Sequence, residues 1–241
     1  TQQSALPGAT SQALPRLRFV TPDRAGLPAL EQYASLRMPD GSRRMMGSSD
    51  ATRGCKHLCR HCPIVPVYQG QFRVVPLDVV MEDVRGQVAA GAQHVSFADP
   101  DFLNGPTHAR HLVERFHGEW PDVTYDVTIK IEHLLSHADM MPVLRDTGCL
   151  FITSAVEAID DVVLGHLKKG HTRADFIKVA GVCRDAGVTL VPTFVPFTPW
   201  TTLSGYVELL DVLEELDLVE QVAPIQLAIR LLVTSGSPLL E

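Results

Sequence analysis

The chain has 241 residues, enough for one large α/β domain or two small ones. Apolar residues make up 45% and charged residues 20%, as in ordinary globular proteins, and no apolar run of about 18 residues predicts a membrane span. The formal net charge of −7 disfavours a nucleic-acid partner, because such binding depends on neutralising phosphates. The five cysteines, three of them clustered, disfavour a disulfide framework and fit a reducing cytoplasm.

The first residues differ in composition from the rest of the chain. Residues 1–17 are rich in Ser, Ala, Gln and Pro and show no periodicity, which predicts a loosely ordered segment. Residues 18–241 are expected to form one domain, with a short helix around Ala29–Leu36 at its start.

The body of the chain alternates short apolar runs with helical patterns. The predicted strands are Arg44–Ser49, His94–Ala98, Thr124–Ile129, Leu150–Val156, Thr189–Val195 and Ala223–Leu232. The predicted helices are Pro76–Ala90, Pro106–Glu119, Ile131–Thr147, Ile159–Leu167, Arg173–Ala186 and Thr202–Leu216. Glycines at 91 and 187 follow helices, and Thr172 and Thr202 are expected to cap helix N-termini. This α/β alternation predicts a partial (β/α)6 TIM-like barrel, with a doubly wound parallel sheet as the alternative.

Three cysteines, Cys55, Cys59 and Cys62, stand at C-x3-C-x2-C spacing just after the first predicted strand. Chemistry in such folds belongs at the C-terminal ends of the strands, so the three fall at the expected active face. Three thiolates can hold three irons of a [4Fe–4S] cluster and leave the fourth iron free to bind a small molecule. The alternatives are a zinc site completed by His57 or His61 and a simple electron carrier. Both require further cysteines nearby, and the remaining two, Cys149 and Cys183, are isolated in the sequence.

The phrase from Thr52 to Cys62 resembles the first loop of the radical S-adenosylmethionine (SAM) superfamily. Two further segments extend the resemblance over roughly residues 45–240. The segment 155–164 with Lys169-Gly170-His171-Thr172 resembles the fourth-strand pattern of that family, and 186–202 resembles its fifth-strand region. The resemblance implies an enzyme that binds SAM at the open iron and cleaves one C–S bond after electron transfer from an external donor such as flavodoxin or ferredoxin.

The resemblance also implies cofactor contacts. His61 occupies the position, before the third cysteine, that packs near the adenine in relatives, and Glu157 is expected at the ribose or methionine of SAM, with Ser154 beside it. Asp99 is the expected partner of the SAM amino group, with Asp101 as the alternative.

Strand alternation adds two cations to the expected SAM contacts. Lys130, at the end of the third strand, is expected to meet the SAM carboxylate or a substrate anion. Arg230, on the sixth strand, is expected to point inward and hold a carboxylate. Structural alternatives also remain: a helix N-cap or turn aspartate for Asp99 or Asp101, a solvated strand-end lysine for Lys130, and a surface salt bridge for Arg230. Several other histidines are expected on helix surfaces and turns, namely His94, His108, His111, His117, His137 and His166.

In detail, Arg60–Tyr68, Ala98–Phe102 and Val195–Thr202 resemble the radical SAM proteins with a Cys-Cys/Sec-Ala-Glu-Pro tail, a group that includes the enzyme of arsinothricin biosynthesis. The sequence does not contain that tail. This resemblance implies a transferase that moves the 3-amino-3-carboxypropyl group of SAM to a trivalent arsenical. The alternatives are 5′-deoxyadenosyl chemistry on a small molecule or peptide, and a non-catalytic iron–sulfur scaffold. No candidate cobalamin-binding or RNA-binding domain accompanies the predicted barrel, which disfavours a cobalamin-dependent methylase and a tRNA methylthiotransferase.

Overall fold

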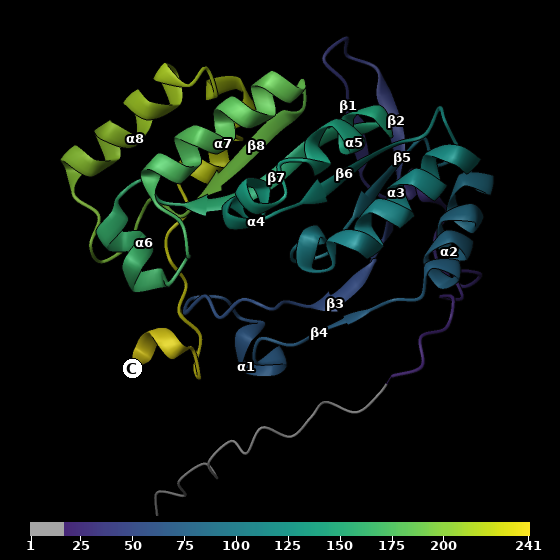
Figure 1. The fold of residues 1–241 in the computed structure, drawn as a ribbon, viewed down its shortest axis with the longest axis horizontal. Coiled ribbons are helices and arrows are strands. Elements are labelled where there is room, and N and C mark those ends of the chain that lie inside the picture. The colour runs from purple at the N-terminus through teal and green to yellow at the C-terminus, as the bar shows by residue number, and fades with distance from the viewer. Residues whose placement is uncertain (1–16) are drawn as a thin grey trace, which may run out of the picture.

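The computed structural model describes residues 17–241, so the prediction for residues 1–16 lies outside the described part of the chain. Its main sheet has six strands in the order β1-β2-β5-β6-β7-β8 (Figure 1). Those strands are β1 (Ser35–Arg37), β2 (Arg43–Ser49), β5 (His94–Phe97), β6 (Thr124–Thr128), β7 (Cys149–Glu157) and β8 (Thr189–Phe194). From β2 to β8 all neighbours are parallel, and only the edge strand β1 is antiparallel. The sheet curls into a half-barrel, which confirms the predicted fold class.

Helices connect successive parallel strands and cover one face of the sheet (Figure 1). They are α2 (Leu77–Ala89), α3 (Pro106–Glu119), α4 (Ile131–Ser136), α5 (Met140–Asp146), α6 (Asp161–Leu167) and α7 (Arg173–Ala186). A further helix, α8 (Leu203–Glu215), follows the last strand, and the short α1 (Val65–Tyr68) lies apart from the sheet, between residues 54 and 72. The predicted caps are confirmed: the Thr172 hydroxyl accepts from the Asp175 N–H, and the Thr202 hydroxyl accepts from the Gly205 N–H. Gly187 ends α7 with a φ of 72°, a conformation that glycine adopts without strain.

The core lies between the sheet and its covering helices. Phe97 on β5, Tyr125 on β6 and Phe116 on α3 are almost fully buried and meet one another edge-to-face at centroid distances of 5.5–5.8 Å. Such aromatic pairs contribute beyond the area that they bury. Because side chains alternate along a strand, the neighbours of these residues in sequence point to the opposite face of the sheet.

That opposite face carries a polar network on β5 and β6. His94 contacts the Thr124 hydroxyl at 2.8 Å and the Asp126 carboxylate at 2.9 Å, and Ser96 donates to Asp126 at 3.0 Å. His94 has no exposed surface, so the prediction that it lies on a helix surface or turn is wrong. A buried histidine of this kind is retained because both ring nitrogens have partners.

Two predicted elements differ from the structure. The helix expected over Ile131–Thr147 is two helices, α4 and α5, because Pro142 has no N–H and its ring clashes with a continuous preceding turn. The sixth strand expected over Ala223–Leu232 is a 3₁₀ turn, Pro224–Leu227, followed by one parallel bridge between Phe197 and Arg230. Pro224 again explains the change, since it cannot donate to a ladder and favours the start of a turn.

The start of the described chain also departs from prediction. The helix expected around Ala29–Leu36 is a 3₁₀ turn, Leu30–Gln32, that leads into β1. A separate two-stranded ribbon, β3 (Thr52–Gly54) with β4 (Phe72–Val74), projects beyond the C-terminal end of β2. The three clustered cysteines lie between the two strands of this ribbon, at the edge of the half-barrel where the parallel strands end (Figure 1).

Candidate active site

The loop between β3 and β4 holds Cys55, Cys59 and Cys62, all of them free thiols. Gly54, directly before it, has a φ of 90°, and a Cβ there would meet the Gln71 carbonyl oxygen at 2.5 Å. Only glycine therefore lets the chain enter the loop at this point. Within the loop the Cys62 N–H donates to the Cys59 carbonyl at 3.2 Å, a turn that brings the second and third cysteines together.

Hydrogen bonds fix this loop to three distant segments. The Arg60 N–H donates to the Leu167 carbonyl at 2.9 Å, and its guanidinium donates to the Pro238 carbonyl at 2.7 and 3.0 Å. On the other side, the Lys56 N–H donates to the Asn104 side chain at 3.2 Å. A loop held from several sides presents its cysteines in one arrangement, as a preformed cofactor site requires.

Two of the thiols are disfavoured as thiolates by their surroundings. Burial raises the pKa of Cys55 and of Cys62, and the nearby Cys59 raises each pKa further. Three such groups become thiolates when a cationic centre compensates their charge. A zinc site needs its ligand atoms close together around one ion. Within residues 17–241 the group of ligand atoms that lie within 4.8 Å of one another is His57, Asp101 and His133, and the three sulfurs do not form such a group. The arrangement therefore fits thiolates on separate irons of a cluster.

A buried charged group adjoins the loop at the end of β7. Glu157 accepts from His61 at 3.1 Å and pairs with Lys169 at 3.5 Å, and it is only 9% exposed. Burial disfavours ionisation of Glu157, but His61 and the Lys169 charge outweigh it and lower its pKa. Glu157 has a φ of 71°, an uncommon value for a residue other than glycine, and strain of this kind concentrates at functional sites.

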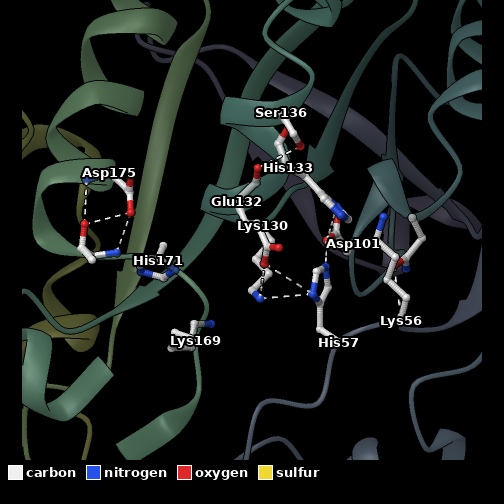
Figure 2. Close-up of polar contacts among 12 residues, drawn as sticks. Lys56, His57, Asp101, Lys130, Glu132, His133, Ser136, Lys169, His171 and Asp175 are labelled. Atoms are coloured by element: carbon white, nitrogen blue, oxygen red, sulfur yellow. Dashed lines mark hydrogen bonds and ion pairs between the residues drawn. The ribbon is translucent and has the colours of Figure 1, made fainter. Parts of the chain in front are cut away.

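A second charged group follows β6. Lys130 donates to Glu132 at 3.0 Å and lies 3.2 Å from the Nδ1 atom of His57, which belongs to the cysteine loop (Figure 2). Gly170 packs directly on this pair, because a Cβ there would meet the Glu132 carboxylate at 2.8 Å and the Lys130 ammonium at 3.2 Å. The short Lys169-Gly170-His171 segment therefore joins the Lys130 group to the Glu157 group.

A third group is centred on Asp101, which follows β5. Its Oδ2 atom lies 2.7 Å from the His133 Nδ1 and 3.3 Å from the His57 Nε2, and Asp101 is 1% exposed. Burial opposes ionisation of this carboxylate, yet the two imidazoles prevail and lower the pKa of Asp101. Figure 2 shows the two rings converging on the carboxylate from the loop and from α4.

The structure brings six predicted site residues to one edge: the three cysteines, His61, Lys130 and Glu157. Asp99 lies nearby but is used within the fold, since it accepts from the Ala51 N–H at 2.9 Å and from the Thr52 hydroxyl. Burial raises the pKa of Asp99 to about 6.

The remaining two predicted residues lie apart from that edge group. Ser154 is fully buried on the helix-covered face together with Ile152 and Val156, and its hydroxyl has no partner among the described residues. Arg230 is exposed, in the segment where the sixth strand was expected.

Sequence reasoning missed four polar residues that the structure adds to the site: His57 as a site group in its own right, Glu132, His133 and Lys169. Glu132 and His133 begin a helix, so their own segment carries no active-site signal. A signal for Lys169 existed in the quoted Lys169-Gly170-His171-Thr172 segment. The contact between His133 and Asp101 joins residues 32 positions apart, so no local sequence pattern could have predicted it.

Three thiols on a fixed loop lie beside buried acids and cations at the carboxyl ends of parallel strands, an arrangement with the donor atoms and charges to hold an iron–sulfur cluster and a charged small molecule. Comparison with known proteins agrees. The Radical SAM superfamily model matches residues 50–213, and the chain belongs to this superfamily. Members of this superfamily use a [4Fe–4S] cluster and SAM.

The curated relatives include methylthiotransferases. The chain is 26% identical over 171 residues to the ribosomal protein uS12 methylthiotransferase of Parabacteroides distasonis, covering 65% of this chain and 38% of the relative. It is also 26% identical over 188 residues to the tRNA-2-methylthio-N(6)-dimethylallyladenosine synthase of Fusobacterium nucleatum, covering 70% and 40%. The chain thus spans about two fifths of the length of these relatives. They include the tRNA-modifying class that the acidic charge disfavours.

Solved structures share the fold. The methyltransferase TsrM of Kitasatospora setae, with cobalamin and a [4Fe–4S] cluster bound, has a TM-score of 0.61 at 20% identity and covers 72% of this chain and 33% of that one. The cobalamin-dependent enzyme OxsB, with SAM bound, has a TM-score of 0.65 at 15% identity and covers 80% and 34%. No helix in residues 17–241 has the length and apolar character to cross a membrane.

Proposed function

We propose that this chain is the catalytic core of a transferase that cleaves SAM reductively at a cluster held by Cys55, Cys59 and Cys62. The observation that carries the proposal is the position of these free thiols beside two buried lysines, Lys130 and Lys169. When bound, the [4Fe–4S] cluster supplies the electron that breaks a C–S bond of SAM. An external donor such as flavodoxin or ferredoxin replenishes that electron, and the free thiols are compatible with a reducing cytoplasm.

The protein side chains hold and orient SAM in this proposal. Lys130 and Lys169 attract its carboxylate, because two nearly buried ammonium groups strengthen an anion site where water is scarce. Glu157 stays ionised and accepts from a ribose hydroxyl or the methionine ammonium group, with His61 fixing its orientation. A cavity of about 30 Å³, lined in part by Ile159, Pro196 and Tyr206, adjoins Glu157; it has room for a water molecule but not for the adenine ring.

The proposed acceptor is a trivalent arsenical, and the proposed transferred group is 3-amino-3-carboxypropyl. Three segments that resemble the group containing the arsinothricin enzyme support this choice: 60–68, 98–102 and 195–202. Cys149 and Cys183 do not add an arsenic site, since both are buried and burial raises the pKa of each thiol, to about 11 for Cys183. The acceptor therefore enters as a small molecule above the cluster edge. The named methylthiotransferase relatives support group transfer as the reaction class.

The alternative is 5′-deoxyadenosyl chemistry on a small molecule or peptide. Product analysis separates the two reactions, because a different C–S bond of SAM breaks in each. Cluster-loaded protein is incubated without oxygen with SAM, dithionite and arsenite, and the nucleoside products are measured by chromatography and mass spectrometry. Methylthioadenosine, with a new arsenic–carbon product, supports aminocarboxypropyl transfer. 5′-Deoxyadenosine as the sole SAM product rejects it and favours the alternative.

A further inference from the structure

We propose that His57, Asp101 and His133 bind a divalent transition metal of the Zn²⁺ and Fe²⁺ class, separate from the iron–sulfur cluster. One ligand atom from each residue lies within 4.8 Å of the other two, and this is the compact three-ligand group found in residues 17–241. The proposal does not depend on SAM cleavage, since none of the three residues is a cluster cysteine.

The alignment of the three residues favours a metal over a hydrogen-bonded network. The Asp101 Oδ2 lies 2.7 Å from the His133 Nδ1 and 3.3 Å from the His57 Nε2. All three atoms are nevertheless buried and make no hydrogen bond of good geometry. A chelated ion would satisfy the three atoms together, since metal bonds of about 2.0–2.2 Å place neighbouring ligand atoms roughly 3 Å apart.

Each ligand is held by a different part of the fold. Asp101 uses its other oxygen, Oδ1, to accept from the Leu103 N–H at 3.2 Å, which leaves Oδ2 free. His133 lies in the first turns of α4 and is 3% exposed. His57 comes from the cysteine loop, whose Lys56 N–H is fixed to Asn104. A metal at this point would tie the cysteine loop to the ends of β5 and β6.

The surroundings contain one favourable and one opposing charge. The Glu132 carboxylate lies 3.7 Å from the His57 Nδ1, outside hydrogen-bond distance, and adds negative charge beside a ring whose Nε2 would bind metal. Lys130 lies 3.2 Å from the same nitrogen and its charge opposes a cation, but it also pairs with Glu132 at 3.0 Å. Metal binding is therefore expected to turn His57 from Lys130 toward Glu132.

The donor set selects the class of metal. Two imidazole nitrogens and one carboxylate oxygen suit Zn²⁺ and Fe²⁺ better than Mg²⁺ or Ca²⁺, which prefer oxygen ligands. Three protein ligands leave a position open, as in metal sites that bind water or substrate.

The test is zinc retention by the cluster-loaded full chain. Protein is given ZnCl₂ without oxygen, freed of excess by gel filtration, and measured for zinc by mass spectrometry and for its ligands by zinc X-ray absorption. We expect close to one zinc per chain with only nitrogen and oxygen neighbours at about 2.0–2.1 Å. Asp101→Asn and His133→Ala should each weaken binding by more than the roughly 10–100-fold that loss of an outer-shell partner costs.

His111→Ala is the matched control, because His111 is exposed on α3 and should leave zinc retention unchanged. Circular dichroism checks that each variant is folded, and Asp101→Asn changes neither the size nor the shape of its side chain. Sulfur neighbours in the absorption spectrum, equal retention by Asp101→Asn, or no retained zinc would each overturn the metal site and leave a His–Asp–His network. Absence of SAM cleavage alters none of these readouts.

Discussion

Glu157→Gln tests the buried charged group at the end of β7. The substitution keeps the size of the side chain and its backbone conformation, so the positive φ is not a variable, but it removes the charge that pairs with His61 and Lys169. Lys169 is 4% exposed and would lose its carboxylate partner in a place that water hardly reaches. Removing one partner of a buried ion pair costs about 3–5 kcal/mol, and because glutamine still accepts a hydrogen bond we expect about 3 kcal/mol.

Urea denaturation followed by far-ultraviolet circular dichroism measures this cost as a change in the free energy of unfolding. For a domain of this size the same loss lowers Tm by roughly 6–12 °C. The Glu157 pKa is lowered from its ordinary value of 4.5, so its carboxylate stabilises the fold above that pH. The contribution is lost as the pH falls through the folded-state pKa, so the difference between wild type and variant should shrink below pH 4.5.

Glu208→Gln is the matched control, since Glu208 pairs with Arg173 on the surface and its side chain is 53% exposed. An exposed pair of this kind contributes at most about 1 kcal/mol. Equal losses in the two variants, or a Glu157→Gln penalty that stays constant to low pH, would refute the assignment of a buried, ionised Glu157.

Further predictions concern the loop, the histidine beside Lys169 and the C-terminal contact. Gly54→Ala should reduce iron bound per chain after reconstitution, because its Cβ would meet the Gln71 carbonyl at 2.5 Å; Gly118→Ala on α3, which meets nothing within 4 Å, should bind iron normally. His171 is buried, and its pKa is lowered from 6.5 to about 4. The free energy of unfolding should therefore fall by roughly 2–3 kcal/mol as the pH falls from 6.5 to 4. His171→Gln should lack this pH dependence in urea titrations. Arg60→Ala removes both bonds to the Pro238 carbonyl and should speed proteolysis at the Leu239–Leu240 bond relative to Arg43→Ala, whose guanidinium bonds the half-buried Ser35. Equal rates would argue against that anchor.

The order of strands and helices was predictable because its signals are local. Apolar runs, the threonine caps at 172 and 202 and the glycine after α7 each act within a few residues, and the structure confirms them. Pro224 and Pro142 were visible too, but their effect depends on whether the surrounding ladder or helix can tolerate a missing N–H. The wrong sixth strand and the divided helix follow from that.

The candidate site was predictable where spacing carries the chemistry and not where tertiary contacts do. The cysteine spacing alone indicated a cluster, and strand ends indicated Lys130 and Glu157. Asp99 and Asp101 are two residues apart with the same side chain, and only the structure shows that the first bonds the Ala51 N–H while the second meets two imidazoles. Whether Ser154 points toward the covering helices or toward the opposite face depends on how the strand is set in the sheet. The sequence of β7 alone does not determine this.

The central claim is that three cysteines support reductive cleavage of SAM, and its most direct measurement compares Cys59→Ala with Cys183→Ala. Each purified protein is loaded with iron and sulfide, mixed with SAM and dithionite without oxygen, and assayed for SAM consumption and nucleoside products. Cys59 lies in the cluster loop, whereas Cys183 is buried on α7 within the core. Wild type and Cys183→Ala are predicted to consume SAM and Cys59→Ala to leave it intact. Intact SAM with iron-loaded wild type, or cleavage that persists in Cys59→Ala, would contradict the account.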